Sequence, residues 1–396
     1  MQFSSVVGQH SIKEKLVTLV SQNRLSHALL FLGKEGSGAL ELAIALAQYI
    51  VCERNKPTGI NKETSLFGDD IVAPKEFLND SCGVCPSCKK ASEHIHPDIH
   101  YSFPTISTVE KAKSSDFIVE WRNFLNQTPF GNAYDWIQSL SSENKQGNIT
   151  TYECEDILRK LHLKSFESGY KILIQWLPEY LGNEGNKLLK MIEEPPPNTL
   201  FIFVAEEESR IIPTILSRTQ LIKINKLENE EVEKWLNVKY NVPSAKARNI
   251  STLAQGNLRE AFQLLNQGDE DWNELLREWL NAILKSGPSA QVKWIEDVSK
   301  LGREKQKQFI SYFIHLIGTA LHEKMMGTSE GANETEVDFA QRLNKIVAPE
   351  QLEAIVNELD RASFYIERNA NPKMLFMALS IKIYHIIKDK SVILIN

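Results

Sequence analysis

The sequence predicts an α/β domain built on a parallel, doubly wound sheet and followed by helical domains. Three short apolar runs, at 29–33, 170–174 and 199–205, predict buried strands. The segments between them repeat apolar residues at helical spacing, and strands that alternate with helices are typical of parallel sheets. Beyond Leu227 the strand patterns fade, and the remaining sequence has a helical pattern.

The first strand and the first long helix have the clearest signals. LLFLG at 29–33 is apolar and ends in glycine, and GALELAIALAQYIVC at 38–52 has helical apolar spacing. This order predicts a strand, a tight loop and a helix. The polar stretch 53–81 is predicted to form a loop, while residues 101–146 show no clear pattern and are treated as an insertion.

Further helices are predicted before the later strands and at the end of the chain. ITTYECEDILRKLHLKSF at 149–166 is one, and EGNKLLKMIEE at 184–194 is another, ended by Pro195–Pro197. In the last helix, Asn371 is the predicted N-cap and Pro372 the first residue. The segment FISYFIHLIGTAL carries apolar side chains on one face: Phe309, Phe313, Ile317 and Leu321.

The composition excludes several classes of function. Hydrophobic residues make up 42% of the chain and charged residues 24%, and no apolar run approaches the roughly 18 residues of a membrane span, so we expect no membrane association. The first residues, MQFSSVVGQH, lack the features of a secretory signal, which predicts a cytoplasmic protein with reduced thiols. The net charge of -6 argues against tight, sequence-independent DNA binding by this chain alone.

The stretch GKEGSGAL at 33–40 has the glycines of a phosphate-binding loop without its charge. Such loops need glycines to wrap the phosphates, a lysine to reach them, and Ser or Thr to hold Mg²⁺. Aligning Gly33 and Gly38 with this pattern, with Gly36 between them, places Ala39 at the lysine position and Leu40 at the hydroxyl position. We therefore predict a vestigial loop; the alternative is an ordinary glycine-rich turn between strand and helix.

A second defect follows the strand at 170–174. An active site of this kind has an acidic residue after a hydrophobic strand, to hold the metal and activate water. Here the strand runs into Gln175, Trp176, Leu177 and Pro178. Glu179 is interpreted as a solvated residue at a helix start rather than a magnesium ligand. Two defects in one site predict little or no ATP hydrolysis by this chain.

The segment CGVCPSC gives three cysteines the spacing of a zinc knuckle: Cys82, Cys85 and Cys88. A tetrahedral Zn²⁺ site needs a fourth ligand, for which Cys52 is the best candidate. His94, His96 and His100 are alternatives, although HPD at 96–98 fits a turn equally well. Cys154 is distant in sequence and is predicted to be a small buried side chain.

Two arginines have no role that spacing alone could assign. Arg218 follows Ser217 in IIPTILSRTQ, and Arg259 lies in GNLRE. A lone arginine is usually a surface charge.

Seven motifs taken together resemble the clamp-loader branch of the AAA+ proteins. They are VVGQ at 6–9, RLSHALLFLG at 24–33, the cysteine cluster with HPD, LKSFESGYKILI at 163–174, NKLLKMIEEPPPNTLFIFVA at 186–205, PTILSRT at 213–219 and GNLREA at 256–261. They cover most of residues 1–270, and the set is much more specific than any one motif.

The resemblance implies three domains and a metal site. The domains are an AAA+ domain with a P-loop-type parallel sheet over 1–226, a small helical lid over 227–268, and a helical collar for oligomerisation over 269–396. The zinc module lies around 52–88. The family's four zinc cysteines fall on Cys52, Cys82, Cys85 and Cys88, with an unusually long insertion between the first two.

The resemblance also implies roles for the two arginines. Clamp loaders of this type are rings of five subunits with ATP at the interfaces, and one subunit can complete its neighbour's site with an arginine. The family's Ser-Arg-Cys motif falls on Ser217, Arg218 and Thr219, which makes Arg218 the candidate finger acting in trans. The second sensor motif falls on Arg259, which would face this chain's own vestigial loop.

The resemblance therefore implies an ATPase-deficient clamp-loader subunit within a DNA polymerase holoenzyme. Its first sensor position falls near Ala205 and Glu206, a further departure from an active ATPase. The implied partners are the ATPase motor subunits, the clamp-opening subunit, the sliding clamp, and primer-template DNA reached through the complex. The alternatives are an active motor subunit, which should carry lysine and threonine at positions 39 and 40, and a zinc-dependent nucleic-acid-binding protein.

Overall fold

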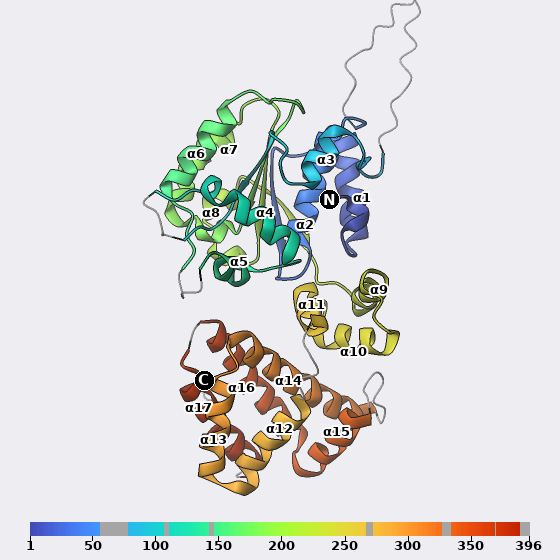
Figure 1. The fold of residues 1–396 in the computed structure, drawn as a ribbon, viewed down its shortest axis with the longest axis vertical. Helices are drawn as coiled ribbons and strands as arrows, with labels where there is room; N and C mark the ends of the chain where they lie inside the picture. The colour runs from blue at the N-terminus through green and yellow to red at the C-terminus, as the bar shows by residue number, and fades with distance from the viewer. Residues whose placement is uncertain are drawn as a thin grey trace, which may run out of the picture. The chain divides into compact units, whose positions relative to one another are not determined.

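The structure is a computed structural model that describes residues 1–55, 78–106, 111–141, 146–266, 272–326, 334–368 and 370–388. Two units are present (Figure 1). The first comprises Met1–Ala247 and Ala254–Leu265, and the second comprises Arg248–Leu253 and Asn266–Asn396. The division into three domains stays a prediction. Most of the predicted loop at 53–81 lies outside the described residues.

A five-stranded sheet forms the centre of the first unit. Its strands are β1 (Ala28–Gly33), β2 (Ile99–Ser102), β3 (Lys171–Trp176), β4 (Thr199–Ala205) and β5 (Gln220–Ile224). They lie in the order β2-β3-β4-β1-β5, and every neighbouring pair is parallel. This confirms the predicted parallel α/β architecture, and β1, β3 and β4 coincide with the three apolar runs.

Helices cover both faces of the sheet because its central strands are apolar on both sides. Leu29 and Phe31 of β1 pack on one face, against α1 (His10–Ser21) and α2 (Ala39–Val51). Leu30 packs on the other, against α6 (Thr151–His162), α7 (Leu189–Glu193) and α8 (Pro213–Leu216). Figure 1 shows these two groups on opposite flanks of the sheet.

The described parts of the segment 101–146, treated as an insertion from its sequence, contribute to the core of the first unit. It continues β2 and then forms η2 (Ser114–Phe117), α4 (Ile118–Gln127) and α5 (Ala133–Leu140). Trp121 and Trp136 are fully buried, and the ring of Trp121 stacks on Phe103 with centroids 4.3 Å apart. Strand β2 escaped prediction because IHYS is short and half polar.

The remaining elements of the first unit are short. The helix predicted at 184–194 is a 3-10 helix, η4 (Gly182–Leu188), that continues as α7. The other elements are η1 (Phe3–Ser5), α3 (Pro86–Ser92), η3 (Pro178–Tyr180), η5 (Glu208–Arg210), α9 (Asn229–Tyr240), α10 (Ser244–Ala254) and α11 (Leu258–Asn266). Residues 248–253 of α10 belong to the second unit.

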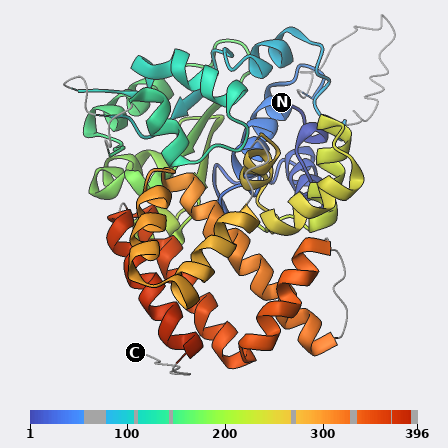
Figure 2. The same cartoon turned by 60° about the horizontal axis from the view of Figure 1, so that its bottom comes forward.

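The second unit is helical, as predicted; its later helices run from orange to red in Figure 2. They are α12 (Trp272–Asn281), the π-helix η6 (Ala282–Ser286), α13 (Pro288–Ser299), α14 (Arg303–Met326), α15 (Glu334–Ile346), α16 (Pro349–Glu367) and α17 (Pro372–Lys388). Phe309, Phe313 and Ile317 are fully buried on one face of α14.

The last helix begins as the sequence predicts. The Oδ1 atom of Asn371 accepts hydrogen bonds from the N–H groups of Lys373 and Met374, at 3.0 and 3.3 Å, and Pro372 is the first helical residue. Within the described residues, none of the helices combines the length and the apolar character needed to cross a membrane.

Candidate functional site

The glycine-rich loop connects β1 to α2 at the carboxyl edge of the sheet. Gly36 and Gly38 have φ values of 69° and 82°, the left-handed region that favours glycine. A Cβ atom on Gly36 would lie 1.9 Å from Oδ1 of Asn257, so this position also requires the absence of a side chain. Ala39 and Leu40 follow as the first, buried residues of α2.

The cavity beside this loop is small. Its volume is about 30 Å³, and it is lined by loop residues together with Phe130, Trp176, Ala205 and Glu206. A cavity of this size has room for water, whereas ligand sites typically measure roughly 300–1,000 Å³. The loop therefore has the backbone turn of a phosphate cradle, and the cavity beside it is small.

Carboxylates lie at the ends of the strands near this cavity. Glu179 is buried, and its Oε1 atom accepts hydrogen bonds from the N–H groups of Glu206 and Glu207, at 2.6 and 2.8 Å. The prediction that Glu179 is a solvated residue was therefore wrong: it holds the turn after β4. Burial, with the charges of Glu35 and Glu179, raises the pKa of Glu206 to about 8. Gln175 lies within β3, next to its last residue, and its side-chain amide is buried.

Arg259, at the start of α11, lies against the loop. Its side chain is only 4% exposed, and its guanidinium forms ion pairs with two carboxylates from distant parts of the sequence. One terminal nitrogen lies 3.0 Å from Oε1 of Glu35, while Nε and the other terminal nitrogen contact the two oxygens of Asp135 at 2.5 and 2.7 Å. Sequence reasoning had not identified Glu35 or Asp135 as functional residues.

Arg218 is on the surface and is not among the residues that line the cavity. Its side chain is 34% exposed and forms an ion pair with Glu193, the last residue of α7. It also donates hydrogen bonds to the carbonyl oxygen of Thr214 at 2.9 Å and to Oγ of Ser217 at 3.1 Å. Ser217 thus helps to orient the arginine.

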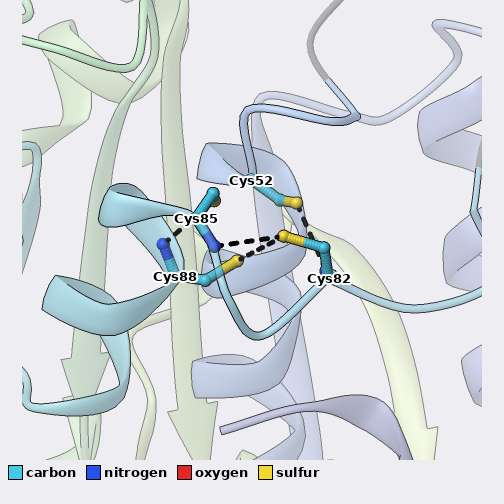
Figure 3. A group of neighbouring side chains, drawn as sticks. All are labelled: Cys52, Cys82, Cys85 and Cys88. Carbon is cyan, nitrogen blue, oxygen red and sulfur yellow. Dashed lines mark hydrogen bonds between the residues drawn. The ribbon is translucent and has the colours of Figure 1, made fainter.

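The four predicted zinc ligands come together (Figure 3). Cys52 follows α2, Cys82 lies in a loop, and Cys85 and Cys88 lie at the start of α3. Their four sulfur atoms lie within 4.8 Å of one another. The sulfurs of Cys82 and Cys88 are 3.9 Å apart, close to the roughly 3.8 Å separation that a tetrahedron of 2.3 Å Zn–S bonds requires.

The histidine alternatives do not join this group. His94 contacts the hydroxyl of Tyr101 at 3.1 Å, and Nδ1 of His96 accepts the N–H of Asp98 at 3.2 Å. His100 is part of β2. Cys154 is buried in α6 with its thiol 3.6 Å from the carbonyl oxygen of Glu184, as expected for a structural side chain.

The chemistry of the four-cysteine group fits a divalent metal ion. Backbone N–H groups point at three of the sulfurs at 3.4 Å, the arrangement expected around thiolates. Burial would raise the pKa of Cys82, but the N–H groups of Val84 and Cys85 outweigh it and lower the pKa to about 6. Burial raises the pKa of Cys52 and Cys88. A cation would compensate the charge of four neighbouring thiolates.

Comparison with known proteins gives a family match over more than half of the chain. The model of the family described as DNA polymerase III, delta subunit, matches residues 8–228. This region contains the glycine-rich loop, the four cysteines and Arg218, but not Arg259.

The individual relatives have low sequence identity to this chain, but their alignments cover most of it. The delta' subunit of DNA polymerase III from Bacillus subtilis is 25% identical over 66% of this chain and 60% of its own length. That of Escherichia coli is 22% identical over 94% and 93%. The tau subunit of DNA polymerase III from Bacillus subtilis is 21% identical over 96% of this chain and 61% of its own. The chain thus spans about three-fifths of the length of the two Bacillus relatives.

Proposed function

This chain belongs to the DNA polymerase III, delta subunit family, and on that premise we propose that it is a non-hydrolysing subunit of the clamp loader. In this role it helps to place a sliding clamp on primed DNA during replication. The observation that carries the proposal is a glycine-rich loop that keeps its turn while Ala39 and Leu40 occupy the lysine and hydroxyl positions, within a chain similar to delta' subunits.

The surroundings of the loop support the absence of hydrolysis. Gln175 offers an amide where a carboxylate would hold Mg²⁺ and activate water. The cavity beside the loop is small, about 30 Å³, and the carboxylate of Glu35 on its lining is unfavourable for a triphosphate. Polymerisation and ATP hydrolysis then belong to other subunits of the holoenzyme.

Arg218 is the residue that we propose acts in trans, with Ser217 beside it. Three contacts hold its guanidinium at the surface: the carboxylate of Glu193, the carbonyl of Thr214 and the hydroxyl of Ser217. An arginine that is ordered and partly exposed can enter a neighbouring subunit's ATP site with little loss of conformational entropy. There its charge would stabilise the transferred phosphoryl group.

The proposed zinc site is structural. Cys52, Cys82, Cys85 and Cys88 would hold Zn²⁺ as a closed set of four sulfur ligands, which leaves no position for substrate. The ion would join the end of α2 to the start of α3.

The proposed partners are those of a clamp loader. They are the ATPase motor subunits and the clamp-opening subunit of a hetero-pentamer, the sliding clamp, and primer-template DNA contacted through the assembly. The second unit, with its helical core, would supply the collar through which subunits associate. The proposed location is the cytoplasm.

Nucleotide binding by the purified full chain tests the proposal. Titration with a fluorescent ATP analogue and Mg²⁺ should show no saturable binding in the physiological range of ATP. Saturable binding that is lost when Gly38 is replaced by valine would favour the motor-subunit alternative. The similarity to a tau subunit is the observation that supports this alternative. Tight DNA binding by the chain alone, with a steep salt dependence, would favour the nucleic-acid-binding alternative.

A further inference from the structure

The glycine-rich loop is bonded directly to the helix that follows Asn257. The N–H of Leu258, the first residue of α11, donates a hydrogen bond to the carbonyl oxygen of Gly36 at 3.0 Å. Asn257 caps this helix, because its Oδ1 atom accepts the N–H of Glu260 at 3.2 Å. Leu258–Leu265 of α11 belong to the same unit as the loop, even though more than 200 residues separate them in sequence.

The carboxylate of Glu35 projects from this loop into a set of donors that would suit a phosphate. The guanidinium of Arg259 contacts one of its oxygens at 3.0 Å, and the side-chain amide of Asn132 donates to the other at 2.7 Å. The amide of Asn257 lies 3.5 Å from the first oxygen, at the N-terminus of α11. Guanidinium, amide and helix N-terminus are the groups that proteins use to bind anions.

The charges around Arg259 are already more than balanced. The carboxylates of Glu35 and Asp135 together bring two negative charges to one buried guanidinium. An incoming phosphate would therefore meet a net negative set of three side chains instead of an unpaired arginine. Displacing Glu35 would also leave a partly buried carboxylate without its main partner, which is costly.

We infer that Glu35 is an internal substitute for a nucleotide phosphate: its carboxylate occupies the anion-binding set of Arg259, Asn132 and Asn257 and holds α11 on the loop without ATP. The missing lysine and hydroxyl make nucleotide binding weak, whereas Glu35 closes the site. The inference rests on the proposed non-hydrolysing role and adds to it the group that takes the nucleotide's place.

The test replaces the carboxylate and supplies inorganic phosphate to the full-length chain. In Glu35→Ala, hydrogen exchange of the α11 amides should speed up by about tenfold, since a charged hydrogen bond is lost. Added inorganic phosphate should fill the vacated position and largely reverse this increase, while the wild-type chain shows no response. Glu35→Gln, which keeps the shape of the side chain but not its charge, should show a smaller increase that phosphate reverses less, because the position stays occupied.

Two controls make the outcome specific. Lys34→Ala alters the same loop at an exposed side chain and should leave α11 exchange unchanged. Sodium chloride at matched ionic strength should not replace phosphate. Unchanged exchange in both Glu35 variants, or a faster exchange in Glu35→Ala that phosphate does not reverse, would overturn the inference. Neither result would affect the proposed function, which instead fails if the wild-type chain binds ATP with saturation.

Discussion

At the residue scale, Asp98 shows how one carboxylate fixes a loop. It is 2% exposed and accepts hydrogen bonds from the N–H groups of Phe166, Glu167 and Ser168, at 2.5, 2.8 and 2.7 Å. The HPD sequence is thus a turn before β2 whose last residue ties down the segment leading into β3. Burial alone would raise the pKa of Asp98, but the three donors outweigh it and hold the pKa below its usual value.

This geometry predicts a pH-dependent stability difference. Asp98→Asn should lower the free energy of unfolding at neutral pH by about 1–3 kcal/mol, because an amide is a weaker acceptor for these three donors. The folded pKa is depressed, so the stabilisation is present above the usual value of about 3.9 and is lost as pH falls through the lower folded pKa. Denaturant unfolding of both proteins between pH 7 and pH 3 measures it, with Asp116→Asn, on the exposed side of η2, as control. A difference that stays constant across this range would contradict the role of the charged form.

The residues missed by sequence analysis share a physical reason. Arg259 lies 224 positions from Glu35 and 124 from Asp135. No local sequence pattern links residues so far apart, and Asp135 lies in a segment whose apolar residues follow neither helical nor strand spacing. The loop itself was predictable because glycine spacing between a strand and a helix is a local property.

At the element scale, the four-cysteine group joins two helices that contribute different members of the set. Cys85 and Cys88 are fixed by the first turn of α3, with Cys85 as its N-cap. Cys52 is fixed by the end of α2 (Figure 3). The CxxCxxC spacing predicts three ligands by itself. The fourth ligand depends on how α2 packs against α3, and for this reason the sequence alone could not choose between Cys52 and the nearby histidines.

Loss of one cysteine should therefore remove the metal. Cys52→Ser and Cys85→Ala should each abolish the single equivalent of zinc and lower the thermal unfolding temperature, because α3 loses its anchor to α2. Zinc content by atomic emission and melting by circular dichroism measure both effects. Cys154→Ala, which alters a cysteine outside the cluster, should retain its zinc. Zinc that persists in Cys52→Ser would assign the fourth ligand elsewhere.

Elements were predictable where their side chains follow one strong pattern. β1, β3 and β4 each contain a continuous apolar run because both of their faces are buried. β2 lies at the edge of the sheet and has four residues, and α4 and α5 mix polar and aromatic residues that become interpretable only once Trp121 and Trp136 pack together. Tertiary packing, rather than local propensity, defines that part of the fold.

At the scale of the whole molecule, the proposed function gives this chain an arginine that acts on a neighbour's ATP site and no working nucleotide site of its own. Arg218 should therefore matter only in the assembled clamp loader. Arg218→Ala should leave folding and assembly intact while depressing the DNA- and clamp-stimulated ATPase of the reconstituted complex. In GTPases an arginine finger raises kcat by about 10³–10⁵-fold. The single ATP site that Arg218 completes should therefore lose almost all of its activity, and the ATPase of the whole complex should fall by the fraction that this site contributes.

The control for this experiment is Arg210→Ala, which removes another exposed arginine that pairs with Glu207 at 4.0 Å. Its complex should hydrolyse ATP at the wild-type rate. Assembly is verified by the mass of the intact complex. If the Arg218→Ala complex then hydrolyses ATP at the wild-type rate, Arg218 is not an arginine finger. Equal losses in both variants would point to a general effect of surface charge.

The buried aromatic residues give the two units different optical properties. Trp121 and Trp136 pack edge to face at 88° in the first unit, whereas Trp279 and Trp294 stack at 5° with centroids 4.8 Å apart in the second. Indole pairs with such different mutual orientations couple differently to polarised light. Near-ultraviolet circular dichroism, with one pair at a time changed to phenylalanine, should thus report on each unit separately.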